Sequence, residues 1–498
     1  MAADVDLAAA IDASEPLLAA QVRDPRQVLL PPAERPARLR RPFCLLDTTY
    51  GELVRSTVRA GMQVMRPRRT IMKHHGRAVM AGGFAVPKSD VEDRTISPMD
   101  LNELLDRRRL CRPRFAYVPL LRSCTAPREG RLLVSKRDAR HFFHHLRSGK
   151  RWRKWMAHPA PPSCSRVPCH RSLPMGFSCS PGWAQAFTDA CTAAAELPED
   201  RRVHPDREDR ACLLVWASIM DDLWAIEQRD LHEAAEDGPR WLSRAAAEWE
   251  LRGVPSHPGK AVDGAEAQEV QGYFVHSRLK WVGVSLPKRR LALQATWHCL
   301  MEEAVPGCEI DRLVGKHGFC HSVRAPLRSI FEASYTWLPE LRRRPKRLMR
   351  VPPAVWAELA CSMLLLPVCQ FDLAAPWSAR LECTDSSMTG IGRSWAVAEP
   401  SDIARYCRAA DAKGLYTNLA LPFGVEVDPY RVCPLRRVQL PLGHYRWRHL
   451  GVPLRPRHIT LGEAEAALWA ITDRLRRPED GGCRSLHPLG SAALTWGV

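Results

Sequence analysis

The stretch 213–227, LLVWASIMDDLWAIE, places two adjacent aspartates, Asp221 and Asp222, between two apolar runs. Apolar runs of this length around a short polar pair predict two buried strands joined by a tight turn. Asp favours turns, so the pair has an ordinary explanation as the acidic tip of a hairpin. Adjacent carboxylates also repel each other, however, and the rest of the chain must distinguish a simple turn from a functional site.

The charge of the chain favours a polyanionic partner. Its 498 residues include 73 Lys and Arg against 55 Asp and Glu, a formal net charge of +18. The length suits roughly three domains of ordinary size. Composition alone leaves nucleic acid and an acidic membrane surface as alternative partners. The longest apolar region, 359–371, contains Pro367 and is too short to cross a bilayer, so we expect buried core there and no membrane span.

Cysteine usage and the N-terminal composition indicate an intracellular protein. The first residues, MAADVDLAAAIDASEPLL, are acidic and alanine-rich and lack the basic beginning of a secretory signal. Seventeen cysteines, an odd number, are scattered through the sequence without a CxxC pair. We therefore expect reduced, mostly buried cysteines and a cytoplasmic or nuclear location.

Composition and periodicity divide the chain into five regions. Residues 1–60 are rich in Ala, Pro and Arg, which predicts an N-terminal extension with a short helix and a linker. Strand and helix patterns alternate over 61–290, and helical patterns dominate 291–340. The strongly basic stretch 341–376 is expected to be a linker or connection. A new strand–turn–strand pattern then opens a last domain over 377–498.

A third carboxylate extends the acidic feature of the opening stretch. Asp138 ends the apolar strand pattern LLVSKRD, where a helical pattern begins. If that strand lies beside the 213–219 strand, three carboxylates converge at one edge of a sheet, which is costly unless cations or protons compensate. Mg²⁺ takes one or two carboxylates plus substrate phosphates, and two such ions about 4 Å apart stabilise both oxygens of a phosphoryl transfer. The pattern predicts a two-Mg²⁺ site, with Mn²⁺ as a substitute, for nucleotidyl transfer.

Four blocks of sequence resemble, in the same order, the motifs of retroelement reverse transcriptases. They are FAVPKSDVEDRTISPMDLN (84–102), SKRDARHFF (135–143), LPMGFSCSPGWAQAF (173–187) and SIMDD (218–222). In that family these blocks are the fingers segment, the first palm motif, the block under the template and incoming nucleotide, and the [FY]-x-D-D signature. The resemblance covers about 60–340. It implies an α+β right-hand polymerase with fingers, palm and thumb.

The resemblance also implies a reaction, partners and site residues. The reaction is RNA-directed DNA synthesis, in which dNTPs are added to a primer 3′ end. The partners are an RNA template, a DNA primer and the RNA–DNA hybrid. Asp138, Asp221 and Asp222 would be the catalytic, metal-binding residues. The residues implied to contact the dNTP are Lys88, Arg94, Phe143, Met175 and Gly176.

Each implied dNTP contact has a physical rationale, and several have an ordinary alternative. Lys88 and Arg94 carry groups that suit phosphate oxygens, but they would also be ordinary exposed charges. Phe143 falls where the family places an aromatic ring that would clash with a 2′-hydroxyl and so favour deoxynucleotides. A core aromatic at the start of a helix is its alternative. Gly176 would allow close backbone approach, and Met175 would pack against the nucleotide.

Further stretches resemble the family, and two residues depart from it. Lys260 resembles a lysine near the nucleotide phosphates, with a surface role as the alternative. VQGYFV (270–275) resembles the primer-grip hairpin, and 309–331 resembles thumb helices whose phosphate contacts would be salt-sensitive. Ile219 stands where the signature has Tyr or Phe. Arg137 would compete with a metal ion for the neighbouring aspartate.

The C-terminal region resembles the beginning of a ribonuclease H domain. The stretch 381–392 is similar to its first strand, with Asp385 as a metal ligand, and 458–477 to the helix that supplies a glutamate, here Glu463. Gly490 stands where the next aspartate is expected, and no carboxylate follows it. Two of four carboxylates hold two Mg²⁺ poorly, so we expect a truncated ribonuclease H-like domain without activity. An unrelated α/β domain is the alternative.

The leading hypothesis is the reverse transcriptase of a retroelement. The group that uses a tyrosine recombinase (DIRS-like) is the nearest, because we see neither a protease before the polymerase nor an integrase after it. The alternative is a catalytically degenerate, retroelement-derived protein that binds nucleic acid through a basic channel. An RNA-templated RNA polymerase is disfavoured by Phe143 and by the C-terminal domain.

Overall fold

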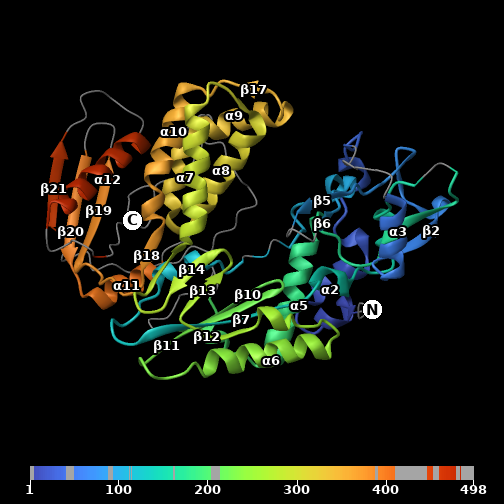
Figure 1. The fold of residues 1–498 in the computed structure, drawn as a ribbon, viewed down its shortest axis with the longest axis horizontal. Helices are drawn as coiled ribbons and strands as arrows, with labels where there is room; N and C mark the ends of the chain where they lie inside the picture. Colours follow the sequence, from blue (N-terminus) through green and yellow to red (C-terminus); the bar gives the residue numbers. More distant parts are fainter. Residues whose placement is uncertain are drawn as a thin grey trace.

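The structure is a computed structural model that contains both helices and strands. It places a central sheet below a helical bundle, with a region of short strands on one side and a C-terminal sheet on the other (Figure 1). The described residues are 5–40, 50–87, 93–111, 113, 115–160, 163–203, 213–386, 391–409, 446–451, 459–477 and 483.

A four-stranded antiparallel sheet forms the centre of the molecule, in the order β10-β11-β7-β12. Its strands are β7 (Arg131–Asp138), β10 (Leu214–Ile219), β11 (Asp222–Arg229) and β12 (Val262–Ala265). β10 and β11 form the predicted hairpin, since Ile219 pairs with Asp222 across a two-residue turn. The strand expected beside β7 was 213–219, but β11 lies between them: β7 pairs with β11 along its whole length and not with β10. Asp138 still reaches the acidic turn, because β11 begins at that turn.

Both faces of this sheet are buried, which explains the continuous apolar runs in its strands. Leu223 and Ala225 face a core shared with helices α5 (Ser180–Ala194) and α6 (Asp237–Leu251). Val134, Trp224 and Ile226 alternate onto the other face, in a second core. Positions 138 and 222 share this second face, at the end of the sheet where the apolar contacts stop.

The N-terminal region is part of the first core. Strand β1 (Val5–Asp6) pairs in parallel with β8 (Leu146–Arg147). Helices α1 (Leu7–Ile11) and α2 (Pro16–Arg23) bury apolar side chains in the core that contains α5. The indole Nε1 of Trp152 donates to the Gln21 carbonyl at 2.9 Å. The short helix is as predicted, but the N-terminal helices are integral to the core rather than a mere extension and linker.

The region between the N-terminal helices and β7 is built from α3 and short strand pairs. β5 (Phe84–Pro87) and β6 (Asp93–Ile96) form a hairpin, and β2 (Gln63–Pro67) pairs with β9 (Arg166–His170). This region also contains α3 (Tyr50–Arg59), β3 (Lys73–His74) and β4 (Arg77–Ala78). The short helix α4 (Phe142–His145) follows β7 in the chain.

A second sheet supports the helical bundle. Its order is β13-β14-β15-β18, with bounds Ala267–Val270, Tyr273–His276, Trp281–Val284 and Gln370–Asp372. The stretch VQGYFV forms the expected hairpin. Gln271 and Gly272 in its turn both have positive φ, +52° and +85°, as a two-residue type I′ turn requires.

Four helices form the bundle above these sheets (Figure 1). They are α7 (Leu286–Met301), α8 (Gly307–His321), α9 (Glu332–Arg343) and α10 (Pro353–Leu364). α10 lies within 341–376, the stretch expected to be a linker. Its Val355 and Leu359 are buried with Ile310 and Leu338 of the other helices. This stretch therefore contributes a fourth helix to the bundle as well as a connection.

The described part of the C-terminal region is a three-stranded sheet with two helices. Its elements are β19 (Arg380–Ser386), β20 (Ile391–Val397), β21 (Arg446–Gly451), α11 (Pro400–Ala409) and α12 (Ile459–Leu475). β19 and β20 form the expected strand pair, with Asp385 opposite Gly392. Buried Glu382 pairs with Arg393 at 2.7 Å, and Arg393 with Asp473 of α12 at 2.6 Å.

Two expectations from composition concern the whole chain. Among the cysteines that the structure describes, the following are buried and form no disulfide: Cys169, Cys179, Cys191, Cys299, Cys320 and Cys369. Within the described ranges, none of the helices combines the length and hydropathy of a membrane-crossing segment.

Candidate active site

Three aspartates lie at one edge of the central sheet. Asp222 begins β11 directly opposite Asp138, the last residue of β7. Asp221 occupies the turn before it, and its carbonyl oxygen accepts a hydrogen bond from the Ala139 amide at 2.9 Å. The pairing of β7 with β11 thus fixes the backbone positions of the three carboxylates at this edge.

Two lysine ammonium groups partly compensate the negative charge of this edge. The Nζ of Lys260 lies 3.0 and 3.1 Å from the two carboxylate oxygens of Asp138. Its loop is tied to the strand by the His257 amide, which donates to the Asp138 carbonyl at 2.8 Å. The Nζ of Lys136 lies 3.5 Å from Oδ1 of Asp222.

Burial and mutual repulsion perturb the hairpin carboxylates. Removal from water raises the pKa of Asp222 to about 6, opposed by Lys136 and reinforced by Asp221 and Asp138. Burial also raises the pKa of Asp221, and Asp138 raises it further. The Oδ1 atom of Asp222 is buried without a hydrogen-bond partner among the described residues. Carboxylates held in this state are typical of functional sites.

Lys136 is the residue at this edge that the sequence analysis did not single out. Side chains in a strand alternate between faces, so a residue two positions before Asp138 shares its face. The same two-residue spacing places Lys136 diagonally across from Asp222 in the paired strand. The sequence could have predicted this position of Lys136, because it stands two residues before Asp138 in the same strand pattern.

The structure places Arg94 near the carboxylates. Arg94 lies on β6, opposite Val86 of β5, and its side chain is exposed. Its positive charge is close enough to Asp221 to lower the pKa of that carboxyl, against the larger effect of burial. Lys88, the other residue expected to contact phosphate, lies outside the described residues.

The two adjacent phenylalanines of α4 have different environments. Phe142 is 2% exposed and packs against Phe187 and Trp249, with ring centroids 5.9 and 6.2 Å away. Phe143 is half-buried at the margin of the same core. Phe142 is therefore fully a core aromatic, and Phe143 packs against the same core in part. Phe143 keeps part of its ring accessible next to the β7 end.

Gly176 is required by a close contact between two backbone segments. Its φ is +110°, and a Cβ there would lie 2.5 Å from the Ser97 carbonyl oxygen. The Ser97 amide donates to the carbonyl of half-buried Met175 at 2.7 Å, and the Asn102 side-chain amide donates to the Gly176 carbonyl at 2.8 Å. The close approach seen here is to the chain after β6, so contact with a nucleotide remains a prediction for this residue.

The structure resolves the expected competition at Asp138. Arg137 points to the opposite face of the sheet, where its guanidinium lies 2.8 Å from Asp263 and donates to Ser243 Oγ at 2.9 Å. It does not pair with Asp138, whose cationic partner is Lys260. Ile219, which departs from the signature, ends β10 opposite Asp222 and is half-buried.

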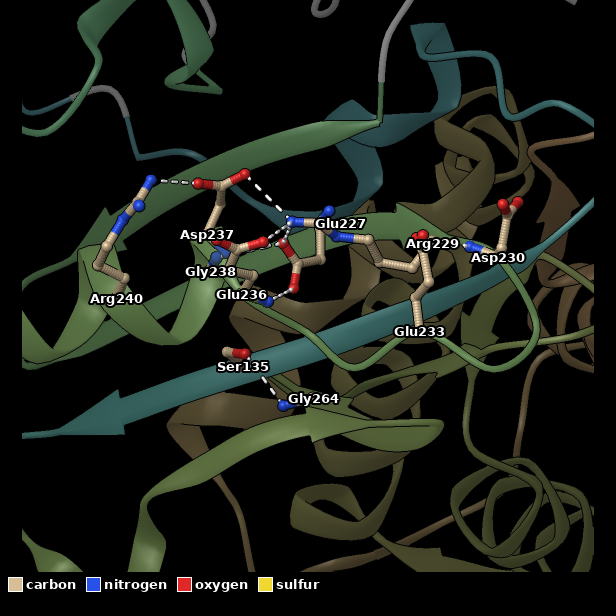
Figure 2. A network of polar contacts seen from close by, with 10 residues as sticks. All are labelled: Ser135, Glu227, Arg229, Asp230, Glu233, Glu236, Asp237, Gly238, Arg240 and Gly264. Atoms are coloured by element: carbon tan, nitrogen blue, oxygen red, sulfur yellow. Dashed lines mark hydrogen bonds and ion pairs between the residues drawn. The ribbon is translucent and has the colours of Figure 1, made fainter.

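A buried glutamate joins the strands of the site to helix α6 (Figure 2). Glu227 of β11 is 1% exposed and accepts hydrogen bonds from three successive amides at the start of that helix. The donors, at 2.7, 3.1 and 3.3 Å, are Glu236, Asp237 and Gly238. A carboxylate there satisfies amides that have no partner within the helix and complements the helix dipole. Glu227 thus links β11 to the first turn of α6.

The donor chemistry of this edge fits Mg²⁺. Within the described part of the chain, no three His, Cys, Asp or Glu side chains form a ready-made metal-binding group. Mg²⁺ does not require one, since it binds through one or two carboxylates and takes its other ligands from water and substrate phosphates. Oδ1 of Asp222, which has Lys136 3.5 Å away but no hydrogen bond among the described residues, and the carboxylate of Asp138 are such hard ligands.

The two residues expected in a ribonuclease H site are placed by their backbones alone. Asp385 lies on β19, and Glu463 lies near the start of α12. Their side chains are outside the described part of the structure, as is Gly490. The ribonuclease H assignment of these residues stays a prediction.

Comparisons with known proteins add a limited similarity. No protein-family model matches the chain, and no curated protein matches its sequence. A structure of the foamy viral protease-reverse transcriptase dRH in complex with double-stranded DNA is similar with a TM-score of 0.44 and 11% identity, over 72% of this chain and 55% of that one. The foamy viral protease-reverse transcriptase with an RNA/DNA hybrid gives 0.45 and 11%, over 91% and 68%. This chain thus spans about half the length of the first of these proteins.

Proposed function

We propose that this protein is a nucleotidyltransferase, the RNA-directed DNA polymerase (reverse transcriptase) of a retroelement. The observation that carries the proposal is the position of Asp138 and Asp222 directly opposite each other, with Asp221 in the turn between β10 and β11. An ordinary acidic turn does not require a third carboxylate from another strand. Two metal ions about 4 Å apart need several oxygen ligands in one place, and carboxylates from neighbouring strands supply them.

Asp138 and Asp221 would hold two Mg²⁺ ions, with Asp222 beside them. When bound, the ions would lower the pKa of the primer 3′ hydroxyl and neutralise the charge of the triphosphate. The raised pKa values of Asp221 and Asp222 indicate that burial disfavours their charged forms in the free protein. Metal binding would remove this penalty and release a proton from any carboxyl still protonated.

The cations around the edge would receive the substrate. Arg94 is exposed and within electrostatic reach of Asp221, and its guanidinium suits two phosphate oxygens. When a metal ion binds Asp138, the Lys260 ammonium would leave that carboxylate and pair with a substrate phosphate instead. Half-buried Phe143 would lie against the sugar and reject a 2′-hydroxyl by steric clash. Lys88 and Met175 complete the implied dNTP contacts.

The β5–β6 region, the β13–β14 hairpin and the α7–α10 bundle would bind the template and primer. In this proposal the central sheet is the palm, the β5–β6 region the fingers and the α7–α10 bundle the thumb. The β13–β14 hairpin would support the primer end. Because these contacts go mostly to phosphates, binding should weaken steeply as salt rises.

The test is Mg²⁺-dependent dNTP incorporation on poly(rA)·oligo(dT). We expect incorporation by the wild type and its loss in Asp221→Asn and Asp138→Asn. Asp230→Asn is the matched control, because Asp230 is exposed just past the opposite end of β11. Incorporation that survives Asp221→Asn would contradict the proposed site.

One observation favours a second candidate function, a degenerate copy that only binds nucleic acid. The Lys260 ammonium contacts both oxygens of Asp138, as it would if a fixed ion pair had replaced the metal. In that case no incorporation would occur with Mg²⁺ or Mn²⁺, while salt-sensitive binding to template–primer would persist. Restored metal binding in Lys260→Met would then identify this ion pair as the cause.

A further inference from the structure

The turn that carries the carboxylates has a backbone that needs external support. Met220 precedes Asp221 and has φ +50°, in the left-handed region that non-glycine residues seldom adopt. Its amide and carbonyl lie in the turn and do not join the ladder between β10 and β11. Backbone groups in a half-buried turn need partners elsewhere, and the partners determine which conformation of the turn persists.

Two side chains of α5 supply both partners. The Met220 amide donates to Oε1 of Gln185 at 2.9 Å. The hydroxyl of Thr188 donates to the Met220 carbonyl at 2.5 Å. Gln185 and Thr188 are three residues apart, so they project from the same face of the helix. They are 7% and 0% exposed, which keeps water from replacing either bond.

The amide of Gln185 is itself held in one orientation. Its Nε2 donates to Asp189 Oδ1 at 2.9 Å and to Ser218 Oγ at 3.0 Å, which turns Oε1 toward Met220. Asp189 forms an ion pair with Arg202, whose guanidinium lies 5.2 Å from the ring centroid of Trp216 on β10. The chain of contacts therefore begins and ends on the strand that leads into the turn.

We infer that Gln185 and Thr188 are positioning residues that hold the Met220 turn in its left-handed conformation and so place Asp221 and Asp222 for metal binding. The inference rests on the proposed function and deepens it. Neither side chain touches substrate; both act through the backbone of Met220. A turn that loses either bond can relax toward an ordinary conformation and carry the adjacent carboxylates away from Asp138. Shifts of about 1 Å in such a group lower rates by about 100-fold.

Matched substitutions on α5 test this role. Thr188→Val removes the hydroxyl at constant shape, and Thr188→Ser retains it. Thr192→Val makes the same change one turn later, where the hydroxyl donates to the Asp189 carbonyl within the helix at 3.0 Å. We expect Thr188→Val to lower kcat at least tenfold and to raise the Mg²⁺ concentration for half-maximal rate. Thr188→Ser and Thr192→Val should stay within about twofold of wild type. Gln185→Met should behave like Thr188→Val.

Two readouts separate this inference from a structural role and from the proposed function. Equal melting temperatures for Thr188→Val and Thr192→Val, with altered Mg²⁺ dependence in the former alone, would support positioning. An unchanged Mg²⁺ dependence in an active Thr188→Val would overturn it. If the wild type incorporates no dNTP, the proposed function fails. Amide hydrogen exchange of Met220 then still tests the inference, which fails if Gln185→Met and Thr188→Val leave that rate unchanged.

Discussion

Asp138 and Asp222 face each other across two paired strands, and each has a different lysine as its cationic neighbour. Lys260 contacts Asp138 from a loop, whereas Lys136 approaches Asp222 from within β7. Asp222 is the more poorly compensated of the two, because its Oδ1 lacks a hydrogen bond while both oxygens of Asp138 accept one. This asymmetry leads to the first prediction.

Asp222→Asn should stabilise the metal-free protein and abolish incorporation. A folded-state pKa of about 6, above the ordinary 3.8, means that stability is lost as pH rises through this window. At pH 8 in a chelator, the variant should therefore melt about 2–4 °C above the wild type. The difference should shrink as pH falls toward 4, where the wild-type carboxyl is protonated in the folded state. A lower melting temperature at pH 8 would contradict the cost assigned to this carboxylate.

The adjacent residues Phe143 and Phe142 allow a matched comparison, in which Phe143 tests substrate selection and Phe142 tests core packing. Phe143→Ala should raise incorporation of ribonucleotides relative to deoxynucleotides by about tenfold or more, because the rejecting ring is gone. Phe142→Ala should instead lower the free energy of unfolding by about 3–5 kcal/mol, since that ring is buried among others. Single-turnover incorporation of each nucleotide and urea unfolding of both variants provide the comparison. Equal selectivity in Phe143→Ala and wild type would remove this residue from the dNTP site.

Buried histidines should make the fold sensitive to acid. Burial lowers the pKa of His158 to about 4, and that of His317 to about 4, from the ordinary 6.5. A neutral histidine in the fold takes up a proton on unfolding, so stability is lost as pH falls from 6.5 toward 4. Each group should contribute about 1.4 kcal/mol per pH unit in that window. Urea unfolding at pH 7 and pH 5 measures the loss. His317→Gln should reduce it, and an unchanged pH slope would show that His317 does not contribute.

The position of His317 explains why it is neutral. Its Nε2 bonds to the Thr296 hydroxyl at 2.6 Å and its Nδ1 to the Ser362 hydroxyl at 2.7 Å. Thr296 already donates to the Ala292 carbonyl, so its oxygen must accept from the histidine Nε2–H. Nδ1 is then the acceptor for Ser362. One ring thus links α7, α8 and α10.

Glu227→Gln should destabilise the protein by about 1–3 kcal/mol, because the amide offers one acceptor oxygen where two accept three backbone amides. Incorporation per folded molecule should change little, since Glu227 lies five residues along β11 from Asp222 and bonds to the start of α6. Glu233→Gln is the control, because Glu233 is exposed near the same network. Chemical unfolding of the three proteins measures the effect. Equal stability of both variants would contradict the helix-anchoring role.

Local patterns were sufficient to predict the β10–β11 hairpin and the β7 strand, because apolar runs bounded by turn residues specify strands directly. The approach of Asp138 to the acidic turn was inferred from chemistry, but with the 213–219 strand as the neighbour of β7, a place that β11 takes in the structure. The α10 helix was obscured by the basic residues before it. Its burial depends on α7 and α8, which no local pattern reveals.

The support of the Met220 turn could not be predicted from the sequence. Gln185 and Thr188 appear there as ordinary polar residues on an amphipathic helix. Their role depends on which strand end the helix packs against and on a left-handed φ at one residue. Both are properties of the tertiary structure.

The parallel pairing of Val5 with Leu146 has a consequence for biogenesis. The first two helices leave the ribosome more than a hundred residues before the strand that completes their surroundings. Until then their apolar side chains have no core to enter, and they must remain exposed or be held by a chaperone. Contacts this distant along the chain slow folding, because a long loop must close first. Fragments that begin after α2 would expose the apolar surface that these helices cover, and we expect them to aggregate on expression.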